Sequence, residues 1–330
     1  MLKKNLLLSL TLASVLFGGG VAKAQPIPQT PEAGPVRIAL EPWLGYGQWA
    51  IADKNGYFAK EGLKDVKLVM FQEDKDLNAA MAGGQVNVAC VSTNTAMAMV
   101  AAGLKVKAVL LMDFSNTADA ILAPASITSI AQLKGSKVAF EEGSTSDVLL
   151  HYALASAHMS MADVIKVPMP AADAGSALLA GRVPVAVTYE PYISAVLNTD
   201  KGYHRLFSAG VDPGLISDVL LVSDDMIKTH PGEVLALLRS WQDALSYYNA
   251  NTADGRSIIA QSVGSDLASL NTAFDGVTYY SVPASREAFN GSFKTKTFYD
   301  VLKAAQQAGL VTGNVTPAEV LDARFLDAAE

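Results

Sequence analysis

The stretch Val36–Leu63, VRIALEPWLGYGQWAIADKNGYFAKEGL, says most about how this chain folds. Its first five residues, Val36–Leu40, form an apolar run that predicts a buried strand, and the turn Glu41–Gly45 ends that strand with a proline and a glycine. A helix pattern begins near Tyr46 and stops at Asn55, which is followed by glycine. A strand that feeds a helix through an irregular turn places polar and aromatic side chains at the carboxyl edge of an α/β sheet, where ligands bind.

The same alternation of short apolar strands and helices continues along the chain. Runs rich in Val, Ile and Leu predict parallel strands covered by helices on both faces. Further strands are expected at Val66–Phe71, Val86–Val91, Val106–Met112, Ala118–Ala123, Lys137–Phe140, Val164–Val167, Val183–Thr188, Tyr203–Phe207 and Ile216–Val222. After these strands the pattern is mostly helical, and Pro231–Ala250 is the longest helix expected.

The N-terminus has the pattern of an export signal. Lys3 and Lys4 precede the apolar run Leu6–Phe17, which is too short for a stable membrane anchor, and Ala22–Ala24 fits a small-x-small cleavage site. We therefore expect residues 1–24 to be removed after Ala24, leaving a flexible, Pro-rich segment at 25–35. No Cys stands at the cleavage point, so the product is expected free in the periplasm.

Composition narrows the class of function. The 330 residues carry 25 Lys and Arg against 32 Asp and Glu, a net charge of −7, which argues against nucleic acid or an anionic membrane as partner. The single Cys90 cannot form an internal disulfide and is expected to be a small buried residue. The four His residues lack zinc-site spacing, and no nucleophile or phosphate-loop motif occurs. The sequence predicts no catalytic residue, no metal and no cofactor.

The phrase Gly56–Leu63, GYFAKEGL, has the form G-x-F-x-x-x-G-L. With the opening strand and its aromatic loop, it resembles periplasmic solute-binding proteins of the nitrate/sulfonate/taurine type, the NMT1/THI5-like group. Leu133–Ala139 and Leu178–Gly181 are similar to phrases of the same group. The resemblance implies an α/β, two-lobed periplasmic binding protein type II fold with a hinge. It also implies a monomer that delivers a small solute to an ABC permease and, through it, to an ATPase.

The resemblance also implies how the lobes divide the chain. Lobe 1 is expected to contain residues 36–118 and 218–330, the second part including the C-terminal helices, and lobe 2 residues 119–217. The strands Ala118–Ala123 and Ile216–Val222 are expected to be the two connections.

Five loops at predicted strand ends hold the candidate ligand residues, apart from Asp218 in the predicted strand Ile216–Val222. The loops are Glu41–Trp49, Ser92–Thr95, Asp113–Asn116, Glu141–Ser146 and Thr188–Tyr192. Their hydroxyl and amide groups can cap the following helix or bind a solute, and both roles stay open. The resemblance implies that Ser92–Thr95 and Gly143–Ser146 contact the solute from opposite lobes, and that Tyr189 or Glu190 faces the cleft. The predicted ligand residues are Glu41, Trp43, Tyr46, Trp49, Ser92, Thr93, Asn94, Asp113, Glu142, Ser144, Thr145, Tyr189, Glu190 and Asp218.

These five loops contain several acidic and aromatic residues but no Lys or Arg. Aromatic faces attract cations, and carboxylates accept N–H bonds, bidentately from a guanidinium-like fork. The phrases Asp113–Asn116 and Pro213–Val219 also resemble the branch of the family found beside urea and guanidine metabolism. The sequence therefore favours a guanidine- or urea-like solute or another small cation.

Other functions remain open from the sequence. A sulfonate, taurine or nitrate would need a basic group from outside the loops, and Lys105, Lys107 and Arg182 are the nearest in sequence. Pyrimidine synthases of thiamine biosynthesis share the implied fold, but they carry a Cys-rich motif that this chain lacks. A sensor that binds its solute without transport is a further alternative.

Overall fold

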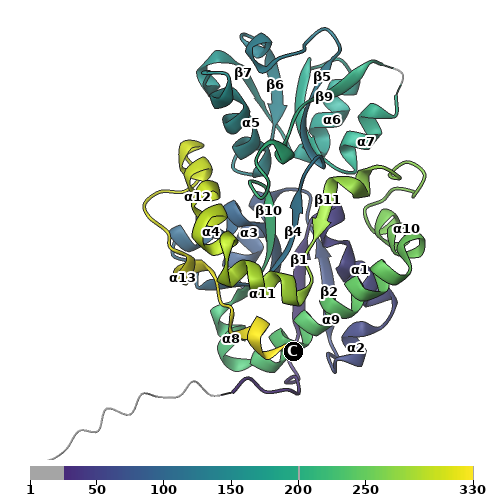
Figure 1. The fold of residues 1–330 in the computed structure, drawn as a ribbon, viewed down its shortest axis with the longest axis vertical. Helices are drawn as coiled ribbons and strands as arrows, with labels where there is room; N and C mark the ends of the chain where they lie inside the picture. The colour runs from purple at the N-terminus through teal and green to yellow at the C-terminus, as the bar shows by residue number, and fades with distance from the viewer. Residues whose placement is uncertain (1–25, 200, 330) are drawn as a thin grey trace, which may run out of the picture.

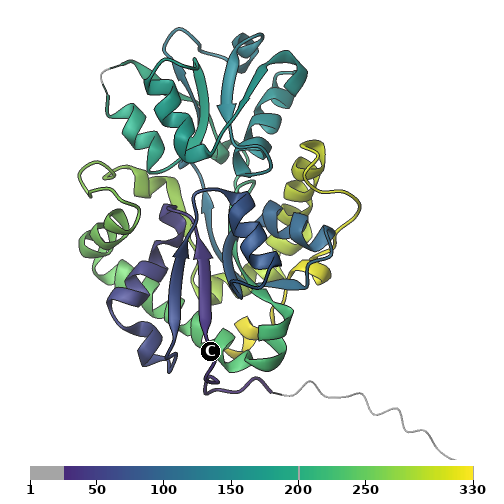
Figure 2. The same cartoon turned by 180° about the vertical axis from the view of Figure 1, so that it is seen from behind.

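The computed structural model describes residues 26–199 and 201–329 as two lobes, each built on a β-sheet covered by helices (Figures 1 and 2). The expected α/β fold with two lobes is confirmed. One sheet has six strands in the order β11-β4-β10-β3-β1-β2, and the other has five in the order β7-β6-β8-β5-β9. The predicted export signal lies outside the described residues.

The strands follow the apolar runs of the sequence. They are β1 Val36–Leu40, β2 Val66–Met70, β3 Val88–Ser92, β4 Val106–Ser115, β5 Asp119–Pro124, β6 Lys137–Phe140, β7 Ile165–Pro168, β8 Val185–Tyr189, β9 Tyr203–Ser208, β10 Ser217–Ser223 and β11 Val277–Tyr279.

The α-helices are α1 Gly47–Lys54, α2 Tyr57–Lys60, α3 Asp74–Ala82, α4 Thr93–Ala101, α5 Thr145–Ser156, α6 Ala171–Leu179, α7 Tyr192–Leu197, α8 Asp224–Thr229, α9 Pro231–Ala250, α10 Thr252–Ser262, α11 Val282–Asn290, α12 Phe298–Gln307, α13 Pro317–Val320 and α14 Arg324–Ala328. Short 3₁₀ turns are η1 Leu44–Tyr46, η2 Ile130–Leu133, η3 Met161–Asp163, η4 Ala209–Val211 and η5 Ala273–Gly276, and η6 Phe293–Thr297 is a π-helical turn.

Both sheets are mixed, which differs from the parallel sheets expected. β1 is parallel to β2 and β3, and β6 is parallel to β7 and β8, whereas β10 is antiparallel to β3 and β4, and β5 is antiparallel to β8 and β9. The reason is the path of the chain. β5 and β10 receive the chain directly after it crosses between the lobes, so they begin at the edge where their neighbours end.

Two short segments carry the chain between the sheets. Residues 116–118 lead from β4 to β5, and residues 209–216 lead from β9 back to β10. The strands expected to be the connections are therefore each part of one sheet, and the crossing takes place just before them. The two segments lie side by side, because Gly210 N donates to Asn116 O, and a Cβ on Gly210 would come within 2.7 Å of that oxygen.

Each lobe has its own apolar interior. In the first lobe one continuous core includes Trp49, Trp241 and Phe298, while the second lobe packs helices against both faces of its sheet. α12, near the C-terminus, contacts α4 of the first lobe and α5 of the second (Figure 1). None of the helices within the described residues is long and apolar enough to cross a membrane.

The segment predicted to be flexible, residues 25–35, has no regular structure where it is described, but it is attached to the first lobe. The carboxylate of Glu32 accepts hydrogen bonds from Gly232 N and Glu233 N, the unpaired groups at the start of α9.

Candidate functional site

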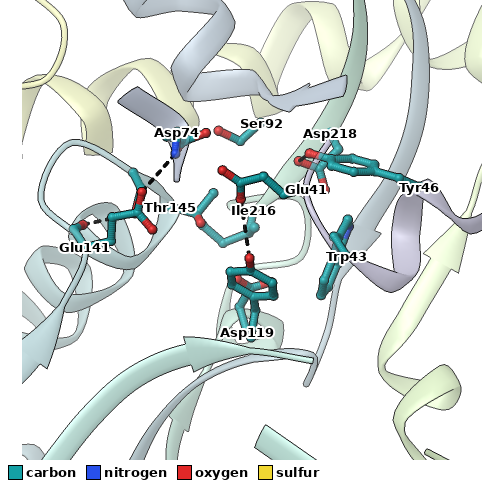
Figure 3. A pocket seen from close by; sticks show the side chains of 12 residues that line it. Glu41, Trp43, Tyr46, Asp74, Ser92, Asp119, Glu141, Thr145, Ile216 and Asp218 are labelled. Carbon is teal, nitrogen blue, oxygen red and sulfur yellow. Dashed lines mark hydrogen bonds between the residues drawn. The ribbon is translucent and has the colours of Figure 1, made fainter. Parts of the chain in front are cut away.

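A cavity lies where the strand ends of the two sheets face each other. The space between its walls amounts to about 420 Å³, including the part continuous with solvent. Figure 3 shows most of its lining residues from close by. They are Glu41, Trp43, Tyr46, Asp74, Ser92, Asp119, Glu141, Ser144, Thr145, Tyr189, Ile216 and Asp218.

The fold explains why acidic residues meet here. Glu41 follows β1, Glu141 follows β6 and Tyr189 ends β8, so each lies at the carboxyl end of a strand that points at the cavity. Asp119 and Asp218 stand at or near the starts of β5 and β10, which begin at the same edge. The antiparallel crossing strands therefore add two carboxyl groups that a purely parallel sheet would place elsewhere.

Trp43 lines the cavity, and the buried side chain of Asp113 holds its indole ring in place. Its indole Nε1 donates to Asp113 Oδ1 at 3.2 Å, and its ring meets Tyr189 of the other lobe edge-on, with 5.9 Å between the ring centroids. Gly45 makes this arrangement possible, because a Cβ there would lie 2.1 Å from Trp43 Nε1 and 2.4 Å from the carboxyl of Asp113. Asp113 thus does not line the cavity but orients a residue that does.

Two carboxyl groups face each other on neighbouring strands behind Trp43. Asp113 of β4 and Asp218 of β10 are direct partners in the antiparallel register, and like charges opposite each other are unfavourable. Burial, the charge of Asp218 and a hydrogen bond to it raise the pKa of Asp113 well above its usual range. Asp218 also accepts from the hydroxyl of Tyr46 at 3.1 Å, as Figure 3 shows. Of the two groups, Asp113 has its pKa raised further, while the pKa of Asp218 rises to about 6.

The carboxyl groups around the cavity raise one another's pKa. Burial and then the nearby Glu141 and Asp218 raise the pKa of Asp74 to about 8. Burial and then Asp218 raise the pKa of Asp119 to about 7, and burial raises that of Asp218 to about 6. The pKa of Glu41 lies well above its usual range because of burial and the charges of Asp74, Glu141 and Asp218. A positive charge placed among these groups would relieve this mutual repulsion.

The loops that contain Ser92 and Ser144 cap the helices that follow them. Capping was one of the two roles that the sequence left open, and solute binding was the other. The side chain of Ser92 accepts from Thr95 N at the start of α4, and that of Ser144 accepts from Ser146 N at the start of α5. Ser92, Ser144 and Thr145 also line the cavity.

Several predicted residues do not line the cavity. Trp49 is fully buried in the first lobe, where it stacks on Phe58 and packs against Trp241. Thr93 and Asn94 are buried in α4, and the hydroxyl of Thr93 donates to Ser217 O.

Glu142 and Glu190 are likewise absent from the lining, although both follow strands of the second lobe. Glu142 is exposed and pairs with Lys166 at 2.7 Å. Glu190 is fully buried, accepts from Arg205 at 2.9 Å and receives the N–H of Ser194. The site role predicted for Glu190 does not follow from this geometry.

We expect Glu190→Gln to lower the stability of the protein, on the order of 1 kcal/mol, and to leave solute affinity unchanged. The reason is that the amide keeps an acceptor for Ser194 but loses the charge-assisted bond to Arg205. Urea denaturation and calorimetry measure the two effects separately. An affinity loss in folded protein would place Glu190 in the site after all.

Four lining residues were missing from the predicted set: Asp74, Asp119, Glu141 and Ile216. Glu141 directly follows the predicted strand Lys137–Phe140, and Asp119 is the second residue of the predicted strand Ala118–Ala123, so a position at a strand end was a usable signal. Asp74 is the first residue of α3 in the first lobe, and at the cavity its N–H donates to Glu141 of the second lobe, a contact that the sequence does not indicate.

No Lys, Arg or His stands among the described residues that line the cavity. Of the basic residues considered for an anion, Lys105 and Arg182 are exposed, and Lys107 donates to the backbone oxygens of Ala318 and Glu319. Within the described residues, no group of three or more His, Cys, Asp and Glu side chains has the arrangement of a metal site.

Comparison with known proteins agrees with the fold. The protein family described as NMT1/THI5 like matches residues 47–253, well over half of the chain. The chain belongs to this family. A relative from Brucella abortus (strain 2308), named as a binding protein, is 25% identical over 275 residues, 82% of each chain.

Solved structures share the fold at low sequence identity. The alkanesulfonate-binding protein SsuA from Xanthomonas axonopodis pv. citri superposes with a TM-score of 0.67 at 19% identity, over 85% of this chain and 99% of that one. The periplasmic nitrate-binding protein NrtA from Synechocystis PCC 6803 gives 0.65 at 14% identity, over 86% of each. This member of the NMT1/THI5-like family therefore has the two-lobed periplasmic binding protein fold, and the relatives described above are named as binding proteins.

Proposed function

We propose that this protein is the periplasmic solute-binding component of an ABC importer and that it captures a small organic cation rich in N–H donors, guanidinium-like or closely related. In this proposal residues 1–24 are the export signal, the two lobes close on the solute, and the closed form docks on the permease. The observation that carries the proposal is the ring of five carboxyl groups, from both lobes, around a cavity lined by no basic side chain.

The free acceptor atoms suit such a solute. Glu41 Oε2 accepts from the hydroxyl of Tyr189 at 3.4 Å, but Glu41 Oε1 is shielded from solvent and has no hydrogen-bond partner. Asp74 receives one long bond, 3.5 Å, from the hydroxyl of Thr95. A planar cation with several N–H groups can supply the missing donors and the charge together. Trp43, Tyr46 and Tyr189 offer aromatic surface beside these acceptors.

An anion fits this environment poorly, although relatives of known structure are named for sulfonate and nitrate. It would lie among like charges in a partly dry cleft, where screening is weak. Similarity at the level of the fold does not identify the solute of this chain.

A thermal-shift panel on the mature protein tests the proposal. The panel contains guanidine, methylguanidine, urea, choline, taurine, an alkanesulfonate and nitrate. At 100 times its dissociation constant, a solute that binds only the folded protein adds about 2.7 kcal/mol of stability, which raises the melting temperature by several degrees. We expect guanidine-type cations to give this shift.

The other members of the panel discriminate between the alternatives. A shift with choline alone would favour an aromatic cage over N–H recognition, because choline has no N–H group. A shift confined to the sulfonate or nitrate would contradict the cation proposal while leaving the binding-protein fold intact.

A further inference from the structure

We infer that Glu141 is a positioning residue that bridges the two lobes and makes closure depend on what occupies the cavity. Its Oε1 accepts from the backbone N–H of Asp74 in the first lobe at 3.0 Å, and its Oε2 accepts from the N–H of Ala171 in the second lobe at 3.0 Å. Figure 3 shows the bond between Asp74 and Glu141 at the rim of the cavity. A single buried carboxylate therefore contacts both halves of the molecule.

Both bonds are made to the first residue of a helix that has no cap of its own. Asp74 begins α3 after Glu73, and Ala171 begins α6 after Pro170, and neither preceding residue makes a side-chain cap bond. The first N–H groups of a helix have no partner inside it, and negative charge is favourable at that end. Glu141 supplies a partner and a charge to both helices.

Only one of the two hydrogen bonds of Glu141 depends on closure of the lobes. Glu141 and Ala171 belong to the same lobe, so the cap on α6 does not depend on closure. Asp74 belongs to the other lobe, so the cap on α3 requires the lobes to be together. Closure therefore gains one charge-assisted hydrogen bond that the open form lacks.

Closure of the lobes also brings carboxyl groups together, which is unfavourable. The side chain of Asp74, like that of Glu141, lines the cavity. Bringing the backbone of Asp74 to Glu141 brings their two carboxyl groups together, with Glu41 nearby. In the empty protein this repulsion opposes the bridge at a pH above the Asp74 pKa of about 8, where both carboxyl groups are charged. A bound cation removes the repulsion and leaves the hydrogen bond, so occupancy favours closure; this last step rests on the proposed function.

A distance measurement between spin labels on α3 and α6 tests the bridge without any solute. Ala79 and Ser176 are exposed positions on these helices, and the natural Cys90 is buried, so Ala79→Cys and Ser176→Cys can be labelled selectively. At a pH above the Asp74 pKa of about 8, we expect Asp74→Asn, which keeps the backbone N–H but removes the charge, to shift the free protein toward the short, closed distance. Adding Glu141→Ala to Asp74→Asn should abolish that shift.

Two results would overturn the bridge: a free Asp74→Asn protein no more closed than the wild type, or a double variant as closed as Asp74→Asn alone. Circular dichroism checks that each variant folds, and Glu141→Gln, which keeps one acceptor oxygen, serves if Glu141→Ala does not. Because these distances are measured without solute, the bridge stands or falls independently of which solute binds.

With a solute from the thermal-shift panel, stopped-flow kinetics provide a second readout. Glu141→Gln should release the solute on the order of tenfold faster, since the closed form loses a charge-assisted bond. Glu287→Gln, an exposed glutamate on α11 outside the cavity, is the matched control and should leave the rate unchanged. An unchanged rate in Glu141→Gln would contradict the bridge.

Discussion

Glu41→Gln is expected to weaken binding of a guanidinium-like cation by roughly 10- to 150-fold, about 1.5–3 kcal/mol for the loss of a charge-assisted hydrogen bond. Glu41 follows β1 directly, and its Oε1 is the lining carboxylate oxygen that is both shielded from solvent and without a partner. The glutamine oxygen can still accept from Tyr189, so the local geometry is kept while the charge is lost. Calorimetry on the two proteins measures the difference.

Glu41→Gln should make the free protein more stable, although it weakens binding of the cation. Glu41 carries a raised pKa because burial and three neighbouring acids oppose its charge, so a neutral glutamine relieves repulsion when no cation is present. Glu287→Gln should change neither quantity. If Glu41→Gln bound a sulfonate or nitrate more tightly than the wild type does, the solute would be an anion and the cation proposal would be wrong.

The affinity for the cation is expected to rise steeply between pH 6 and pH 8. The free protein holds protons on Asp74, with a pKa of about 8, and on Asp119, with a pKa of about 7, and a cation binds best when these protons leave. If one proton with a pKa near 8 is displaced, linkage gives an increase on the order of 50-fold across this range. A guanidinium keeps its charge throughout, so the change comes from the protein.

The same two groups, Asp74 and Asp119, determine whether the stability of the free protein rises or falls with pH. Their pKa values are higher in the folded protein than in the unfolded chain, so they stabilise the fold when protonated, and this contribution is lost as the pH rises from about 4 to about 8. Free protein should therefore melt at lower temperature at pH 8 than at pH 6, while the shift caused by the cation should grow. Calorimetry in buffers of different ionisation enthalpy should show proton release on binding.

Asp74→Asn provides the internal check on this pH dependence. It removes the carboxyl group with a pKa of about 8, so the rise in affinity should become shallower and move to lower pH. A wild-type affinity that is flat or falls between pH 6 and pH 8 would contradict the exchange of protons for a cation.

Much of the framework followed from local patterns. The apolar run Val36–Leu40 and the turn after it predicted β1 and a loop at the sheet edge, because burial and backbone restrictions act within a few residues. The longest helix, Pro231–Ala250, has the bounds that its proline start and its apolar period predicted. The serines at 92 and 144 cap the helices that follow them for the same local reason.

Other features could not be predicted locally because they depend on partners far along the chain. Trp49 resembled the aromatic residues of the site, but packing against Trp241 places it in the core. β5 and β10 run against their neighbours only because the chain enters them from the other lobe, and that direction sets Asp218 opposite Asp113.

Glu141 and Glu190 show the limit most clearly, since both are acidic residues directly after a strand of the second lobe. Arg205, on β9 two strands away from β8 in the same sheet, pairs with Glu190 and holds its carboxylate away from the site. The N–H groups of Asp74 and Ala171 hold Glu141 at the cavity. The sequence by itself determined that acidic residues gather at the strand ends. Tertiary structure decided which of them line the cavity. That depends on which hydrogen-bond or ion-pair partner the fold places beside each carboxylate.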